Sequence, residues 1–189
     1  MISKVVVLGL GFVGSAMSVD IASSKNTKSV PNFDVVGIDL PNSQGRKRIK
    51  AINEGKFPFS TQDQKLVNHL NTCHDQGNLR ASSSKSHLKD ADYIVIDINL
   101  DARKKKLKNQ KVFSSFEVEM KQFKNSIKEI ASVCKPSALI LIETTVPPGT
   151  TENIVLPIFK RIFKKRKILS TPCIAHSYER VMPCLLYTS

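Results

Sequence analysis

A glycine-rich turn near the amino terminus has the residue types and the spacing of a phosphate-binding loop. The segment Gly9-Leu10-Gly11-Phe12-Val13-Gly14 follows a continuous apolar run and matches the pattern Gly-x-Gly-x-x-Gly. Between a strand and a helix, the first glycine permits the tight turn, the second lets the backbone approach a pyrophosphate, and the third lets helix and strand pack closely. The positive end of the helix dipole then faces the diphosphate. We therefore expect this segment, Phe12 and Val13 included, to bind a dinucleotide.

An acidic residue, Asp39, closes the next apolar run at 34–39. A carboxylate at the end of the second strand accepts hydrogen bonds from the adenosine ribose and repels a 2′-phosphate, which favours NAD over NADP. Asp39 comes 25 residues after Gly14. The usual spacing is ~20 residues, and the polar stretch 25–32 accounts for the excess as an insertion. Arg46 and Arg48 keep the alternative open, since an arginine nearby could hold the 2′-phosphate of NADP.

The elements that must position these residues alternate between strand and helix. Their pattern predicts an α/β fold, a doubly wound parallel sheet of the Rossmann type with helices on both faces, formed as a single domain by an incomplete chain. Strands are expected over 2–8, 34–39, 79–83, 91–98, 138–143 and 167–172. Helices are expected over 14–24, 43–53, 61–71, 114–134 and 150–165, with Thr150 as the N-cap of the last.

The helix signal after residue 113 is the clearest in the chain. Ser114 and Glu117 have the spacing of a capping box, which marks a helix start. Apolar residues follow on one stripe at helical spacing, which predicts a core-facing helix. They are Phe116, Met120, Phe123, Ile127, Ile130 and Cys134.

The chain is strongly basic, and this charge calls for an anionic partner. The sequence has 29 Lys and Arg against 16 Asp and Glu, a net charge of +13 at pH 7. Nucleic acid or a phosphate-bearing small molecule would suit such a charge. The basic residues gather at 103–111 and 160–167, without interleaved aromatic residues. Nucleic acid is therefore disfavoured as a partner, and we interpret the clusters as a solvated loop and a solvated helix end.

Membrane and metal sites are also disfavoured. The longest apolar runs fall far short of the ~20 residues that cross a bilayer, and residues 1–10 lack the pattern of a secretion signal. We therefore expect a cytoplasmic protein with no membrane partner. Without Cys-x-x-Cys spacing, the cysteines are expected to be free thiols, and no metal site is expected. The cysteines are Cys73, Cys134, Cys173 and Cys184.

Three further motifs, taken together with the glycine turn, indicate a family more specifically than the glycine turn does alone. Residues 53–58 read Asn-Glu-Gly-Lys-Phe-Pro, residues 143–151 read Glu-Thr-Thr-Val-Pro-Pro-Gly-Thr-Thr, and residues 177–183 read Ser-Tyr-Glu-Arg-Val-Met-Pro. In this order they resemble the N-terminal, NAD-binding part of the nucleotide-sugar 6-dehydrogenases, the UDP-glucose/GDP-mannose dehydrogenase family. The resemblance covers 1–183. It departs from the family at Asn99-Leu100, where Thr-Pro is usual, and at Tyr178, where Pro is usual.

The resemblance implies an NAD-dependent enzyme that oxidises the primary alcohol of a nucleotide sugar to a carboxylate, through a thiohemiacetal and a thioester on a cysteine. By the same resemblance, Thr145 would hold a catalytic water near the nicotinamide, and so would serve both catalysis and cofactor binding. Glu179 would help water to attack the thioester as a general base. The alternatives are a loop hydroxyl that bonds the backbone and, for Glu179, a salt bridge with Arg180.

The family's nucleophilic cysteine, catalytic lysine and asparagine would lie beyond this sequence, as would its central helical domain and its sugar-nucleotide domain. Residues 184–189 fit no family pattern, and we interpret them as a non-native or truncated tail. We therefore expect a fragment that holds NAD but is inactive alone, with a homo-oligomer only in the full-length protein. Two alternatives stay open: a Rossmann dehydrogenase of the 3-hydroxyacid type, and a basic non-catalytic module that binds nucleic acid.

Overall fold

A six-stranded parallel sheet forms the centre of the molecule. The computed structural model describes residues 2–100, 102–106 and 113–177, with the backbone alone at 102–106 and 113–117. The strand order is β3-β2-β1-β4-β7-β8, and every pairing is parallel. The strands are β1 (Ser3–Leu8), β2 (Phe33–Ile38), β3 (Leu79–Ser82), β4 (Tyr93–Ile96), β7 (Leu139–Ile142) and β8 (Cys173–His176).

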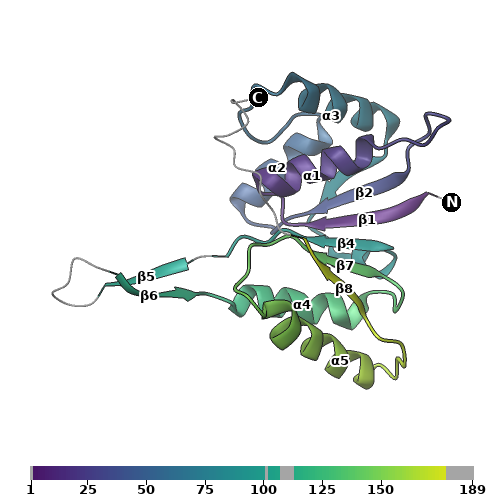
Figure 1. Ribbon diagram of the computed structural model, residues 1–189. Coiled ribbons are helices and arrows are strands. Elements are labelled where there is room, and N and C mark those ends of the chain that lie inside the picture. Colours follow the sequence, from purple (N-terminus) through teal and green to yellow (C-terminus); the bar gives the residue numbers. More distant parts are fainter. Residues whose placement is uncertain (1, 101, 107–112, 178–189) are drawn as a thin grey trace.

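Helices cover both faces of this sheet (Figure 1). One face carries α1 (Phe12–Ser23), α2 (Ser43–Asn53) and α3 (Gln64–Gln76). The other carries α4 (Lys121–Val133) and α5 (Leu156–Lys165), which a π-helical turn, Thr151–Val155, precedes. A short 3-10 helix, Lys85–Lys89, joins β3 to β4. The doubly wound Rossmann-type fold expected from the sequence is confirmed.

The central strands are apolar throughout because each one serves two cores. Val5 and Val7 of β1 pack into the core under α1 and α3, whereas Val6 and Leu8 pack into the core under α4 and α5. Successive side chains of a strand point to opposite faces, so a strand with helices on both sides needs no polar positions. The continuous apolar runs in the sequence follow from this arrangement.

The predicted helix start at Ser114 is wrong. Residues 113–118 form a strand, β6 (Phe113–Val118), which pairs with β5 (Ala102–Lys106) in a separate antiparallel sheet. This hairpin extends away from the main sheet at its carboxyl edge (Figure 1). Helix α4 begins at Lys121, whose backbone N–H donates to the Glu119 carboxylate at 3.1 Å. Four members of the predicted stripe are confirmed as core: Phe123, Ile127, Ile130 and Cys134. Met120 is partly buried against the same core, whereas Phe116 belongs to β6.

Further boundaries differ from the sequence-based expectation; α3 spans Gln64–Gln76, where a helix was expected over 61–71. The last strand begins at Cys173, after residues 167–172, because Lys167 takes a left-handed conformation (φ 58°) that ends α5 and turns the chain. Thr150 is not a side-chain cap, because its hydroxyl donates to the Pro147 carbonyl at 2.7 Å. Within residues 2–100, 102–106 and 113–177, no helix has the length and apolar character needed to cross a membrane.

Arg166, just after α5, links α4 and α5, the two helices that cover the same face of the sheet. Its guanidinium donates to the carbonyls of Ala131 and Cys134, at 2.7 Å and 2.9 Å, where α4 ends. These last-turn carbonyls have no partner within their own helix, and a cation there also complements the helix dipole. The guanidinium lies 5.6 Å from the centroid of the Phe163 ring.

We expect Arg166→Met to lower the free energy of unfolding by about 1–3 kcal/mol, because charged donors to the α4 carbonyls are lost. Urea unfolding followed by circular dichroism measures the difference. The control is Arg161→Met, at an exposed arginine within α5, which should change stability by less than about 0.5 kcal/mol. Equal effects of the two substitutions would contradict this role for Arg166.

Candidate dinucleotide-binding site

Three backbone segments meet at the glycine turn between β1 and α1. Gly9 has a left-handed φ of 105°, and a Cβ there would overlap the carbonyl oxygen of Asp97, at the end of β4. A Cβ on Gly14 would overlap the carbonyl oxygen of Gly9. A Cβ on Gly11, in contrast, would meet no atom within 4 Å. The outer glycines therefore allow close packing, while the middle one borders open space.

The first turn of α1 faces this open space. Gly11 is the N-cap residue of α1, and being glycine it offers no side-chain acceptor to the first-turn N–H groups. Such groups attract anions, because they have no partner within the helix and carry the positive end of its dipole. The turn itself is fixed by the Gly9 N–H, which donates to the Ile38 carbonyl of β2 at 2.8 Å. This arrangement suits a diphosphate at Gly11.

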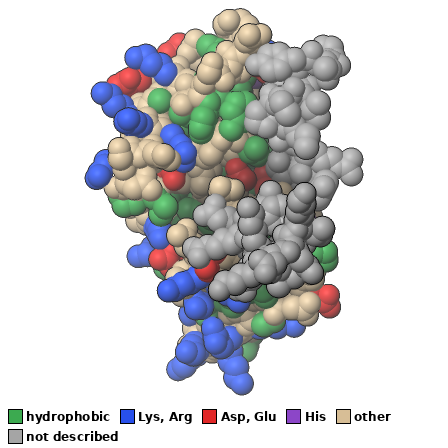
Figure 2. Space-filling view, turned by 90° about the vertical axis from the view of Figure 1, so that its left-hand side faces the viewer, with side chains coloured by type: hydrophobic (Ala, Val, Ile, Leu, Met, Phe, Trp, Pro, Cys, Tyr) green, Lys and Arg blue, Asp and Glu red, His purple; other side chains and the backbone are tan. Residues whose placement is uncertain are grey.

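A cavity of about 1020 Å³ adjoins the turn at the carboxyl edge of the sheet. Ligand sites in proteins have volumes of ~300–1,000 Å³, so the cavity can hold a large part of a dinucleotide. All five residues from Gly9 to Val13 line it, and so does Asp39. A second wall comes from α4 and includes Gln122, Asn125 and Glu129. In the view onto the carboxyl edge, apolar side chains gather above the centre, and basic side chains lie along the left and lower margins (Figure 2).

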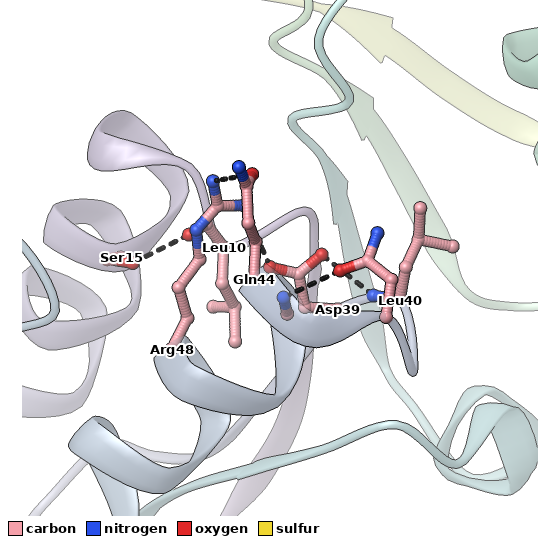
Figure 3. Close-up of polar contacts among 8 residues, drawn as sticks. Leu10, Ser15, Asp39, Leu40, Gln44 and Arg48 are labelled. Atoms are coloured by element: carbon pink, nitrogen blue, oxygen red, sulfur yellow. Dashed lines mark hydrogen bonds and ion pairs between the residues drawn. The ribbon is translucent and has the colours of Figure 1, made fainter.

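Asp39 stands at the end of β2, as expected, but it is paired with a cation. Its Oδ2 lies 3.1 Å from Nη1 of Arg48, and its Oδ1 accepts the Leu40 N–H at 2.7 Å (Figure 3). Nη2 of Arg48 makes a longer contact, 3.4 Å, with Oε1 of Gln44. Arg48 lines the cavity, whereas Arg46 is not among the lining residues. Of the two arginines that complicate cofactor choice, only Arg48 is therefore at the site.

The segment 53–58 has a structural explanation. The Asn53 side chain bonds both backbone groups of Ala81 in β3, accepting its N–H at 2.7 Å and donating to its carbonyl at 2.9 Å. The chain that follows places Phe57 and Phe59 against Phe12 of the glycine turn, with ring centroids 5.6 Å and 5.7 Å away. This aromatic cluster supports the rim of the cavity, which Phe12 and Phe59 both line.

The second predicted motif reaches the same edge of the sheet, after β7. Thr144 is buried, and its hydroxyl links β7 to β4 by accepting the Ile98 N–H at 2.9 Å and donating to the Ile96 carbonyl at 3.2 Å. Thr145 is exposed and is not among the residues that line the cavity. Glu179 lies outside the described residues. The roles of Thr145 and Glu179 therefore stay predictions.

The sequence analysis did not single out Asp97 and Phe59, which also line the cavity, and it did not predict that Arg48 pairs with Asp39. Asp97 follows the apolar run of β4 directly, just as Asp39 follows that of β2. The rule that ligands bind at the carboxyl ends of parallel strands could have identified it. Phe59 lies one residue beyond the 53–58 motif, and no local pattern marks it.

The cysteines of the described residues have different environments. Cys73 and Cys134 are buried, and this burial raises the pKa of each thiol above its ordinary value, which keeps it protonated. Cys173 is exposed. Cys184 lies outside the described residues. In the part of the chain that is described, no three His, Cys, Asp or Glu side chains gather closely enough to hold a metal ion.

Gly14→Ala should destabilise the protein by about 1–3 kcal/mol, because the new methyl group forces the first turn of α1 away from Gly9. This loss should exceed the gain of ~1 kcal/mol that alanine brings to a helix. Gly11→Ala, which meets open space, should leave stability unchanged or slightly higher. Urea unfolding of the two variants tests this contrast, and a Gly14→Ala protein as stable as Gly11→Ala would contradict it.

Comparisons with known proteins agree with this geometry. The family model for the UDP-glucose/GDP-mannose dehydrogenase family, NAD binding domain, matches residues 3–185. The UDP-N-acetyl-D-mannosamine dehydrogenase of Methanocaldococcus jannaschii is 28% identical over 185 residues, which are 95% of this chain and 35% of that protein. The enzyme of the same name from Pyrococcus horikoshii is 27% identical, over 95% of this chain and 37% of its own length. The chain thus spans about a third of these relatives.

Solved structures show the same fold. NDP-N-acetyl-D-galactosaminuronic acid dehydrogenase from Methanosarcina mazei Go1 superposes with a TM-score of 0.76 at 22% identity, over 97% of this chain and 36% of that one. A ternary complex of GDP-mannose dehydrogenase from Pseudomonas aeruginosa gives a TM-score of 0.73 at 18% identity, over 96% of this chain and 37% of that one.

Proposed function

Because the chain belongs to the UDP-glucose/GDP-mannose dehydrogenase family and corresponds to its NAD-binding domain, we propose that residues 9–14 bind the diphosphate of NAD within a nucleotide-sugar dehydrogenase. The observation that carries the proposal is the open space at Gly11 in front of the first turn of α1. Any side chain at Gly11 would fill the space that a diphosphate needs. The membership also sets aside the 3-hydroxyacid dehydrogenase that the sequence left open.

Binding of the diphosphate at Gly11 also fixes where the other parts of the cofactor lie. With the diphosphate at Gly11, the adenosine ribose reaches Asp39, whose carboxylate oxygens can each accept a further hydrogen bond from a ribose hydroxyl. The adenine then occupies the cavity between Phe59 and the α4 wall, where Gln122 and Asn125 can offer hydrogen bonds to its edge. The nicotinamide end extends toward the ends of β4 and β7.

The proposed reaction of the whole protein is the oxidation of a nucleoside-diphosphate sugar at its primary alcohol. Bound NAD would supply a hydride acceptor. Thr145 follows β7 and is exposed at the carboxyl edge, so its hydroxyl can hold a water molecule beside the nicotinamide. Glu179 would act as the general base that helps water to attack the thioester. Both relatives above are named as UDP-N-acetyl-D-mannosamine dehydrogenases, which supports a UDP-sugar as the substrate.

The organisation of the whole protein is also a proposal. We propose that residues 1–183 make up the NAD-binding domain and that residues 184–189 are a tail outside it. The proposed location is the cytoplasm. A homo-oligomer is proposed for the full-length protein.

We expect the chain to bind NAD saturably in calorimetry and Gly11→Val to weaken that binding at least about tenfold, because a valine side chain enters the diphosphate site. The melting temperature should not fall, since Gly11 has an extended backbone (φ −61°, ψ −174°) that valine tolerates. Thr72→Val, at an exposed position of α3, is the control and should bind NAD as the wild type does. Equal affinities of wild type and Gly11→Val would refute the assignment.

A further inference from the structure

Helix α5 has one apolar face and one strongly basic face. Phe159 and Phe163 are buried in the core, with their ring centroids 5.8 Å apart. The helix contains no acidic residue, and its cations are exposed on the opposite side. They are Lys160, Arg161, Lys164, Lys165 and, just after the helix, Lys167. A basic amphipathic helix of this kind is typical of segments that bind a membrane surface or another acidic partner.

Helix α4 extends this basic face. Arg166 donates to the carbonyl of Ala131 at 2.7 Å, which places that side of α4 next to α5. Lys128 and Lys124 precede Ala131 at helical spacing and therefore lie on the same side of α4. Together with the exposed cations of α5 and Lys167, they form what we call the α4–α5 basic surface.

The charge of the α4–α5 basic surface is not neutralised within the part of the chain that the structure describes. None of its cations forms an ion pair there. Lys and Arg side chains gather at the lower end of the molecule in Figure 2, the end at which Figure 1 places α5. The positive charges therefore add up on one side of the molecule, and they favour an extended anionic partner over a single small anion.

An exposed leucine borders the α4–α5 basic surface because of the way α5 ends. Lys167 is left-handed, its N–H donates to the Lys164 carbonyl at 3.1 Å, and the Ile168 N–H donates to the Phe163 carbonyl at 2.9 Å. Ile168 packs against the core, whereas the next side chain, Leu169, is fully exposed. A leucine beside cations can enter the boundary between lipid headgroups and acyl chains. It offers no bond to the phosphates of nucleic acid, so a lipid surface is favoured.

The α4–α5 basic surface faces away from the cavity. A helix that connects parallel strands runs opposite to them, so Leu169, beyond the end of α5, lies at the amino edge of the sheet. The cavity lies at the carboxyl edge. On α4, Asn125 and Glu129 line the cavity, and each follows Lys124 or Lys128 by one residue, which turns it about 100° around the helix. A membrane bound to the basic surface would therefore leave the cavity open.

We propose that the α4–α5 basic surface binds the anionic phospholipids of a membrane, with Leu169 entering the boundary between headgroups and acyl chains. Such binding is peripheral and needs no helix that crosses the bilayer. Clusters of about four to eight Lys or Arg residues on an amphipathic helix are typical of lipid binding, and each cation strengthens it about fivefold. No residue of this surface lines the cavity, so the proposal does not rest on the binding of a dinucleotide.

Sedimentation of the chain with lipid vesicles tests the proposal. The chain should bind vesicles of phosphatidylcholine with about a quarter phosphatidylserine at least tenfold more strongly than vesicles of phosphatidylcholine alone. Added salt should weaken this binding. A variant with all four cations of α5 replaced should lose at least about tenfold in affinity for the anionic vesicles. Its substitutions are Lys160→Gln, Arg161→Gln, Lys164→Gln and Lys165→Gln.

A control variant removes the same charge from exposed positions on the other face of the sheet. Its substitutions, in α2 and α3, are Arg46→Gln, Lys47→Gln, Lys50→Gln and Lys65→Gln. It should lose less than about threefold in affinity for the anionic vesicles, because these positions do not face the membrane. Thermal unfolding followed by circular dichroism checks that both variants fold. Equal losses in the two variants would overturn the proposal, by showing that net charge alone decides binding.

Leu169→Ser distinguishes a lipid surface from other anions. It should weaken binding to the anionic vesicles at least about threefold, because an apolar contact with the membrane is lost. Its melting temperature and its binding to duplex DNA should stay as in the wild type, since Leu169 is fully exposed. Equal wild-type binding to both kinds of vesicle would overturn the proposal, and so would tighter binding to duplex DNA than to the anionic vesicles. Either result would leave the proposed binding of NAD standing.

Discussion

The site depends on a backbone crossing that only glycine permits. The end of β1, the start of α1 and the end of β4 approach so closely that a methyl group at Gly9 or Gly14 would overlap a carbonyl oxygen. This contact sets the direction in which α1 leaves the sheet, and therefore where its first-turn N–H groups point. The cavity, the open space at Gly11 and the place of Asp97 all follow from the same crossing. A change there would move the anion-binding end of α1 as well as loosen the packing.

The adenosine side of the site is built from pieces far apart in sequence. Asn53 holds the end of α2 to β3, and the chain after it carries Phe59 to the cavity rim. Phe59 stacks with Arg48, which in turn pairs with Asp39. Asp39, which is expected to bind the ribose, is therefore held in place by a series of contacts that begins at the edge of the sheet. The same side chains therefore hold both Asp39 and this edge of the sheet in place.

Local sequence patterns predicted the features that depend only on residues close together in the chain. The glycine turn and Asp39 were found because each directly follows a buried strand, whose continuous apolar run is easy to recognise. Ser114 was wrongly assigned to a helix start because the spacing of a capping box can also occur within a strand. The strand forms because 113–118 pairs with 102–106, and neither segment alone encodes that pairing. The ion pair of Arg48 with Asp39 spans a turn and the first half of α2. No motif or spacing in the sequence predicts this ion pair.

The bonds of Asn53 have a further consequence for the free edge of the sheet. β3 is an outermost strand, paired on one side with β2 only. At Ala81, whose N–H and carbonyl are both taken by the Asn53 amide, this edge has no groups to offer to another chain. An exposed edge strand is a template for strand addition and aggregation. The Asn53 amide makes the hydrogen bonds that a neighbouring strand would make. It thus protects β3, which has four residues, from edge-to-edge association.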